Sequence, residues 1–208
     1  MTLDLIRRVI PNAPAAHYDS GAEYSATYEM VKHVDAIPIK PEHDLIWMCK
    51  YGGYWRHENP TDYETNFDFK KILVVEPAER FVDDYRLDVI AMGLRGQESY
   101  GRRMNAKTRG AFYPVEYKKL QHGLHHLCPI IHWSHDDVWA YIAGRNLKYN
   151  SVYDRMAEIG IDRKEQRVSC ILGMVGAGTG WRFSLLRQVD PNRFNELAGE
   201  FPMIKEFC

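Results

Sequence analysis

The segment from Leu87 to Arg103 constrains the fold most strongly, because a short apolar run passes directly into a dense polar cluster. Leu87–Met92 is short and rich enough in β-branched residues to form a buried strand. Gly93 interrupts it, and polar side chains then crowd together at Arg95, Gln97, Glu98, Arg102 and Arg103. Open α/β sheets carry ligand sites at the carboxyl ends of their strands. The segment therefore predicts an α/β fold with an oxyanion site, since guanidinium groups bind phosphate or sulfate in bidentate fashion.

The same residues allow a simpler interpretation. Glu98 and Arg102 are spaced i,i+4, which is the spacing of an ion pair on the surface of a helix. In that case the segment is a strand followed by a solvated helix start with no ligand. The segment alone leaves both interpretations open.

Helical and extended patterns alternate along the rest of the chain. Helices are expected at 2–10, 23–34, 76–85, 134–142, 151–159, 181–189 and 191–199, and strands at 13–18, 36–39, 87–92 and 124–131. Ser134 and Asp137 form a capping box, and Pro191 is placed to begin the last helix. The polar, basic residues 105–114 are expected to form a loop. This alternation predicts a parallel sheet flanked by helices, with an α/β domain over 1–160 and a charged, glycine-rich and helical part over 161–208.

The charge balance excludes several classes of partner. The 27 basic and 28 acidic residues give a net charge of -1, so we expect no membrane partner, and a nucleic-acid partner is disfavoured. No apolar run approaches the length of a membrane-spanning helix, and the N-terminal residues lack a signal-peptide core. The four cysteines, Cys49, Cys128, Cys170 and Cys208, are scattered without a CxxC pair. Their scatter favours a reducing, cytoplasmic location.

Four motifs in order carry a resemblance to a known family. Ala15–Gly21 with Glu23-Tyr24 and Thr27-Tyr28-Glu29 resembles a "DTG-x-E-x-x-x-T-Y" pattern, with Ser20 in place of the threonine. Gly93–Ser99 with Arg102 and Arg103 resembles "GLR-x-x-ES-x-x-R". Pro129–Ile142 resembles "P-I-x-x-W-S-x-x-D-V-W-x-Y-I", and Tyr149-Asn150 with Tyr153-Asp154 continues it. The chain thus resembles the phosphoadenosine phosphosulfate (PAPS) reductase family of the adenine nucleotide α-hydrolase (PP-loop) superfamily.

The resemblance implies an adenine nucleotide as substrate or ligand, namely adenosine phosphosulfate (APS), PAPS or ATP. Asp19 and Gly21 would border the nucleotide at the end of a strand. Arg95 and Glu98 would lie over its phosphate side, with Arg102 and Arg103 as further anion ligands. The implied chemistry is sulfonucleotide reduction or sulfur or nucleotidyl transfer, and the residues do not choose between these reactions.

The chain departs from the family at its N-terminal end. The family's "SGGKDS" loop, whose backbone N–H groups hold phosphate or sulfate, does not precede Asp19. Residues 3–11 resemble the end of the helix that follows that loop, so we expect an N-terminally truncated fold. The glycine-rich residues 173–180 lack a lysine and are expected to be a flexible loop. Loss of a central strand exposes sheet edges, which predicts a homo-oligomer or a partner chain.

The cysteines also depart from the family pattern. The family's C-terminal cysteine lies in "E-C-G-x-H" and attacks the sulfonate sulfur, whereas Cys208 lacks that context, so it is a weak candidate for the catalytic nucleophile. Gly173 occupies the place of a second cluster-binding cysteine after Cys170, so no iron–sulfur cluster is expected. His122, His125, His126 and Cys128 could ligate zinc, but strand alternation separates them, and no metal site is expected. The alternative to an enzyme is a catalytically degenerate member, a possible pseudoenzyme that serves as a binding or scaffold module.

Overall fold

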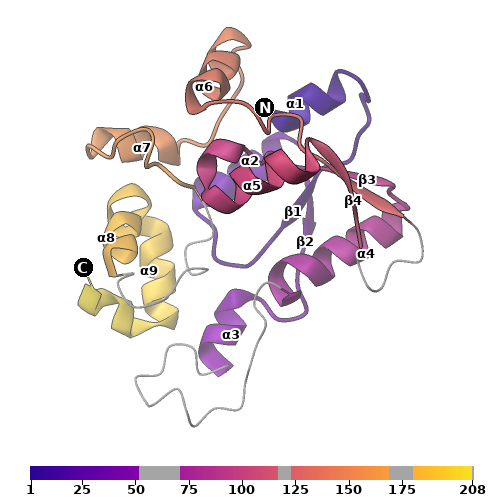
Figure 1. The fold of residues 1–208 in the computed structure, drawn as a ribbon. Coiled ribbons are helices and arrows are strands. Elements are labelled where there is room, and N and C mark those ends of the chain that lie inside the picture. The colour runs from indigo at the N-terminus through magenta and orange to yellow at the C-terminus, as the bar shows by residue number, and fades with distance from the viewer. Residues whose placement is uncertain (52–70, 117–122, 169–179, 208) are drawn as a thin grey trace. The chain divides into compact units, whose positions relative to one another are not determined.

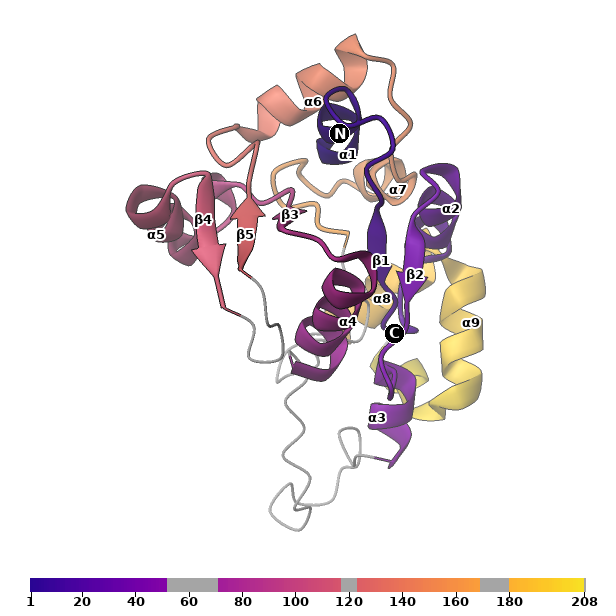
Figure 2. The same ribbon diagram turned by 90° about the vertical axis from the view of Figure 1, so that its right-hand side faces the viewer.

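The computed structural model describes residues 1–51, 71–116, 123–168 and 180–207, which form a mixed α/β structure (Figure 1; Figure 2). The chain divides into two units, and each is built from two separate stretches. The first unit comprises Met1–Ala15 and Ala78–Tyr149, and the second comprises Ala16–Pro77 and Asn150–Cys208. The expected division at residue 160 stays a prediction.

The first unit contains a three-stranded sheet with β5 in the middle. Its strands are β3 (Val89–Ala91), β4 (Phe112–Val115) and β5 (Leu124–Leu127), and its helices are α1 (Thr2–Arg7), most of α4 (Glu76–Tyr85), α5 (Tyr100–Arg109) and α6 (His135–Gly144). β3 runs parallel to β5, and β4 runs antiparallel to it. Tyr113, Cys128 and Ile131 form a small buried core on which Ala106 of α5 packs. The core thus joins the sheet to α5.

The second unit contains a parallel pair of strands joined by a helix. β1 (Ala16–Tyr18) pairs with β2 (Ile37–Ile39), and α2 (Ser25–His33) makes the crossover between them. Parallel strands need such a crossover because a tight hairpin cannot connect them. The other elements of this unit are α3 (Leu45–Tyr51), a π-helical turn (Lys71–Val75), α7 (Val152–Glu158), α8 (Gly180–Val189), α9 (Pro191–Glu200) and a 3₁₀ segment (Pro202–Phe207).

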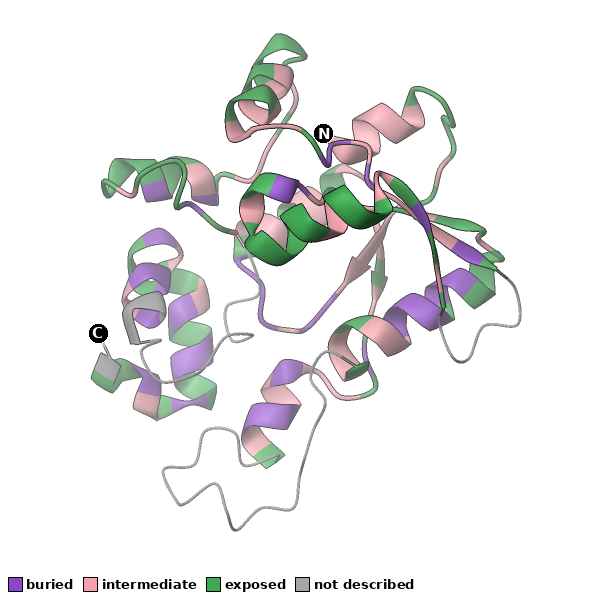
Figure 3. Ribbon diagram, in the orientation of Figure 1, coloured by how far each residue is buried: buried purple, intermediate pink, exposed green. Residues whose placement is uncertain are grey.

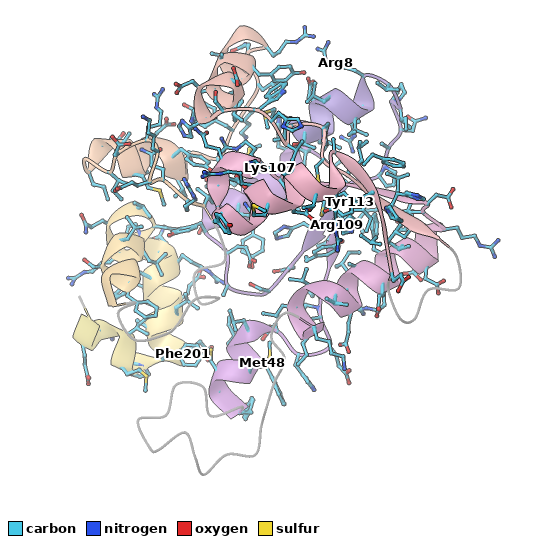
Figure 4. All side chains as sticks on the ribbon, in the orientation of Figure 1. Arg8, Met48, Lys107, Arg109, Tyr113 and Phe201 are labelled. Atoms are coloured by element: carbon cyan, nitrogen blue, oxygen red, sulfur yellow. The ribbon has the colours of Figure 1, made fainter. Side chains whose placement is uncertain are left out.

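The core of the second unit brings together residues from both of its stretches. Met48 of α3 and Phe201, which follows α9, belong to one buried cluster (Figure 4). Leu186 of α8 and Leu197 of α9 are fully buried in the same cluster, and α3 and α9 each carry buried positions along one face (Figure 3). Burial of a leucine side chain contributes about 1.5–3 kcal/mol. This cluster is therefore the main source of stability of the unit.

Two expectations about secondary structure are wrong. Residues 105–114 are not a loop, because they contain the second half of α5 and most of β4. Ser99 Oγ accepts the Arg102 N–H at 3.2 Å and so caps α5, and Gly110, with φ of 76°, ends it. The strand expected at 124–131 ends at Leu127, because Pro129 cannot donate a backbone hydrogen bond to a neighbouring strand.

The remaining predicted helices and strands in the described residues are present, with ends shifted by a few residues. The strand expected to be buried at 87–92 is present as β3 but is not buried, since Val89 and Ala91 are exposed. Ser134 Oγ accepts the Asp137 N–H at 3.1 Å, and the Asp137 carboxylate accepts the Ser134 N–H at 2.8 Å, so the predicted capping box is confirmed. Pro191 lies in the first turn of α9, as predicted. Among the helices described, each is too short or too polar to cross a bilayer.

Candidate functional site

The loop that follows β3 is held against residues 127–131 by backbone hydrogen bonds. Met92 N–H donates to Leu127 O at 2.8 Å, and Gly96 N–H donates to Ile131 O at 2.7 Å. A Cβ atom on Gly96 would lie 3.3 Å from Ile131 O, so a side chain there would strain this contact. Glycine at position 96 therefore lets the predicted anion-binding loop approach the segment before α6.

Glu98 joins two arginines of the predicted site. Its carboxylate accepts a hydrogen bond from Arg95 Nε at 3.3 Å and forms an ion pair with the Arg102 guanidinium. It also accepts the Arg95 backbone N–H at 3.4 Å, which closes the 3₁₀ turn Gly96–Glu98. The ion pair expected from the i,i+4 spacing is therefore present, and it neutralises much of the charge of Arg102.

Arg95 is more deeply buried than an arginine usually is. The residue is 9% exposed, and its Nη1 atom has no hydrogen-bond partner among the described residues. Buried donors are normally paired, so this orphan nitrogen marks a place where an additional acceptor would be favourable. Whether that acceptor is part of a nucleotide stays a prediction.

A pocket of about 390 Å³ lies between the central part of α5 and the residues that precede α6. It is lined by Gly96, Gln97, Arg103, Ala106, Lys107, Ile131, His132, Trp133 and Ser134. Arg103 and Lys107 are four residues apart on α5, so they lie on the same face of that helix. Figure 4 shows Lys107 on α5. The volume lies in the range of small-molecule sites, about 300–1,000 Å³.

The lining combines two positive charges with an aromatic ring. Within the part of the chain that the structure describes, neither Arg103 nor Lys107 forms an ion pair. Gln97 Oε1 accepts the His135 N–H at 2.8 Å, which ties the loop to the first turn of α6. The arrangement offers cations for an oxyanion and the Trp133 ring for a flat aromatic group.

Sequence reasoning named Arg103 but not Lys107 or Trp133 as site residues. Lys107 fell in the expected loop, and Trp133 was assigned to the opening of a helix. Ser99 and Gly110 are residue types that commonly begin and end a helix, so a helix over 100–109 could have been predicted from the sequence. In such a helix the i,i+4 spacing of Arg103 and Lys107 would have placed both cations on one face.

Asp19 and Gly21 lie in the second unit, directly after β1. Asp19 Oδ1 accepts the Gly21 N–H and the Tyr28 hydroxyl, each at 3.0 Å. Gly21 has φ of 79°, and a Cβ atom there would lie 3.0 Å from Asp44 Oδ2, so the turn requires glycine. The structure thus places the predicted site residues in two groups, Asp19 and Gly21 in one unit and Arg95, Glu98, Arg102 and Arg103 in the other.

The described cysteines are poor candidates for a nucleophile. Cys49 and Cys128 are both buried, and neither forms a disulfide among the described residues. Burial raises the pKa of the Cys128 thiol, which disfavours the reactive thiolate. Cys208 and Cys170 lie outside the described residues, as do His122 and Gly173.

His125 and His126, for which we expected no zinc site, each lie against an aromatic ring. The His125 ring stacks on the Phe112 ring with 4.7 Å between the ring centroids. The His126 ring lies edge-on to the Tyr113 ring with 5.6 Å between the centroids. Burial, together with the nearby Arg109, lowers the pKa of His126. Arg109 also lies over the Tyr113 ring, 5.5 Å from its centre (Figure 4).

Comparison with known proteins relates the chain to enzymes of sulfur metabolism. The sequence model named "Phosphoadenosine phosphosulfate reductase domain" matches residues 1–163. Adenosine 5'-phosphosulfate reductase 2 of Bacillus subtilis is 32% identical over 164 residues, covering 74% of this chain and 61% of that protein. Adenosine 5'-phosphosulfate reductase of Halalkalibacterium halodurans is 28% identical over 160 residues, covering 74% and 63% respectively.

Among solved structures, a PAPS reductase from Candida auris in its phosphate complex matches with a TM-score of 0.42 and 21% identity. That match covers 66% of this chain and 63% of the other. This chain spans less than two thirds of the length of the two bacterial relatives.

Proposed function

Because the chain belongs to the phosphoadenosine phosphosulfate reductase domain family, we propose that it binds an adenine sulfonucleotide in the pocket between α5 and α6. The observation that carries the proposal is the pair Arg103 and Lys107, two cations on one helix face that line a pocket together with Trp133. A sulfonucleotide presents an anionic phosphosulfate at one end and a flat purine at the other. The anionic end matches the cations Arg103 and Lys107, and the purine matches the ring of Trp133.

In this proposal the residues divide into ligands and supports. Arg103 and Lys107 bind the phosphosulfate oxygens, and Trp133 packs against the adenine ring. Arg95 and Glu98 hold the loop, while Arg102 balances the charge of Glu98. The roles of Asp19 and Gly21 beside the nucleotide stay predictions.

The names of the relatives favour APS as the first nucleotide to test. In the reduction of APS, a thiolate attacks the sulfonate sulfur and displaces AMP, which leaves an S-sulfonated cysteine. A second thiol, supplied by an external thiol reductant, then attacks the cysteine sulfur, so that a disulfide forms and sulfite is released. Cys208 is the proposed nucleophile for the first step. A reductase with this chemistry would work in the reducing cytoplasm, which is the location we propose.

A second candidate function is nucleotide binding without reduction. It is favoured by the burial of Cys49 and Cys128, since neither of these thiols reaches the solvent as a nucleophile must. An assay of sulfite release from APS, with dithiothreitol as reductant, separates the two functions. Sulfite release that is lost in Cys208→Ser supports the reductase, and its absence in a sample that binds APS supports the binding module.

Calorimetric titration of the 208-residue chain tests the proposed site. We expect APS to bind, and Arg103→Gln to weaken binding about 10- to 100-fold, because a charge-assisted hydrogen bond contributes about 1.5–3 kcal/mol. PAPS and ATP serve as comparison ligands. Lys148→Gln is the matched control, since Lys148 is exposed, lies in the same unit outside the pocket, and loses the same charge. Equal affinity of Arg103→Gln and Lys148→Gln for APS would contradict the proposal.

A further inference from the structure

Three potential metal ligands come together at the end of β1, in the second unit. One ligand atom from each of His17, Asp19 and Glu23 lies within 4.8 Å of the other two. His17 is the middle residue of β1, Asp19 follows the strand, and Glu23 lies two residues before α2. Within the described residues this is the one such group of three, and the sequence motifs did not single out His17.

The turn after β1 creates this proximity. Gly21, in a left-handed conformation, reverses the chain so that Glu23 returns to the strand end. Ser20 Oγ donates to Glu23 Oε1 at 2.8 Å and to Oε2 at 3.0 Å, which fixes the carboxylate. The Tyr28 hydroxyl fixes Asp19 in the same way, at 3.0 Å. Metal ligands are commonly oriented by hydrogen bonds of this kind.

Two carboxylates are buried at this turn. Asp19 is 9% exposed and Glu23 is 6% exposed. In the described residues no lysine or arginine pairs with either of them, and the Arg193 guanidinium binds the backbone oxygens of Gly21 and Glu23 instead. Burial raises the pKa of Glu23, and the charge of Asp19 contributes in the same direction. A bound cation would relieve this unfavourable burial of negative charge.

His17 supplies an independent indication of a ligand. Its Nε2 atom is buried and has no hydrogen-bond partner among the described residues. Among the described residues, Asp19 accepts side-chain hydrogen bonds from the Gly21 N–H and the Tyr28 hydroxyl, both at Oδ1, and its Oδ2 accepts none. Ligand atoms about 2.1 Å from a shared ion lie roughly 3–4 Å apart, so closing the group around an ion requires movements of less than about 1 Å.

We propose that His17, Asp19 and Glu23 form a binding site for a divalent first-row transition-metal ion such as Zn²⁺. An imidazole with two carboxylates suits zinc, manganese or ferrous ions, and the imidazole disfavours Mg²⁺, which prefers oxygen ligands in an octahedron. Three protein ligands leave a coordination position for water or a substrate oxygen. The three ligands lie wholly in the second unit, whereas the pocket proposed for the nucleotide is lined by residues of the first unit.

Calorimetric titration of the metal-stripped 208-residue chain with Zn²⁺ tests the site. We expect one high-affinity ion per chain, and a loss of affinity of about 10- to 100-fold or more in His17→Gln. His33→Gln is the control, because His33 is exposed on α2 in the same unit and should leave binding unchanged. Asp19→Asn, which keeps an oxygen for the Gly21 and Tyr28 hydrogen bonds, should also lose affinity, with its fold checked by circular dichroism.

The thermal midpoint gives a second readout. Zn²⁺ should raise the midpoint of the wild-type chain and of His33→Gln, and should not raise that of His17→Gln. Mg²⁺ at the same concentration should raise none of them. If His17→Gln binds Zn²⁺ as tightly as the wild type, the ion is held by other groups such as the cysteines, and the proposal is overturned. Absence of stoichiometric binding to the folded wild type overturns it as well.

Discussion

Replacing Glu98 with glutamine tests whether the ion-pair cluster holds the loop after β3. Glutamine keeps the size of the side chain and an oxygen acceptor, but it removes the charge that balances Arg95 and Arg102. The Arg95 side chain is 11% exposed and the Glu98 side chain 19% exposed, so water cannot easily replace the carboxylate. The change therefore leaves a largely buried guanidinium without its counter-ion.

The size of the effect follows from this burial. Breaking a fully buried ion pair by removing one partner costs about 3–5 kcal/mol. Because both side chains keep some contact with water, we expect Glu98→Gln to lower the free energy of unfolding by about 2–3 kcal/mol. With a urea dependence of about 2 kcal/mol per molar, the unfolding midpoint falls by about 1–1.5 M.

The assay is urea unfolding at pH 7, followed by circular dichroism. Amide hydrogen exchange adds a local readout, since the Gly96 N–H donates to Ile131 O at 2.7 Å and should exchange faster in the variant. Glu158→Gln is the matched control. Its pair with Arg155 has side chains that are 61% and 63% exposed, so the free energy of unfolding should change by less than about 0.5 kcal/mol. Equal midpoints for Glu98→Gln and Glu158→Gln would refute the reasoning.

Three further changes test other parts of the fold. Gly21→Ala should lower the free energy of unfolding by at least about 1 kcal/mol in urea, since φ is 79° and the new Cβ atom would lie 3.0 Å from Asp44 Oδ2; a neutral effect would mean that the turn relaxes. Ser134→Ala removes the N-cap of α6 and should cost about 1 kcal/mol by the same measurement, and a change below about 0.3 kcal/mol would contradict the role of the cap. Tyr141→Phe removes a 2.6 Å hydrogen bond that lowers the pKa of Asp4 in the folded state. A lowered folded-state pKa stabilises the fold above the unfolded value, about 3.9, and that contribution is lost as pH falls through the folded-state pKa. The stability difference between wild type and Tyr141→Phe should therefore shrink in acid unfolding curves below about pH 4, and a difference independent of pH would contradict this.

Local signals in the sequence predicted much of the fold. Ser134 with Asp137, and Pro191, mark the starts of α6 and α9 through contacts that act within one helical turn. The family was predicted from motifs that occur in the expected order between Ala15 and Asp154, and the family model that matches residues 1–163 confirms it. These features depend little on tertiary packing, so a reading of the sequence alone can find them.

The parts that were missed depend on contacts between distant residues. α5 has few apolar positions, and it is held by its Ser99 cap and by Ala106 against the Tyr113 core, so hydrophobic periodicity did not show it. β4 was missed for a related reason, since it contains a proline and buries only Tyr113. The pocket was missed because α5 was missed, since Arg103 and Lys107 share a face that lines it only when residues 100–109 are helical.

The division of the chain into interleaved stretches has a consequence for how the protein is made. During synthesis on the ribosome, the N-terminal stretch of the second unit, Ala16–Pro77, leaves the exit tunnel before the residues of the first unit that begin at Ala78. Met48 in that stretch can be covered by α8 and α9 only after Asn150 and the residues that follow it have been synthesised. Domains usually fold as units as they emerge, but here the N-terminal half of the second core stays uncovered until α8 and α9 have been synthesised. A nascent chain stalled at Tyr149 should therefore bind chaperones through the apolar face of α3, and a chain long enough to expose α8 and α9 outside the exit tunnel should not.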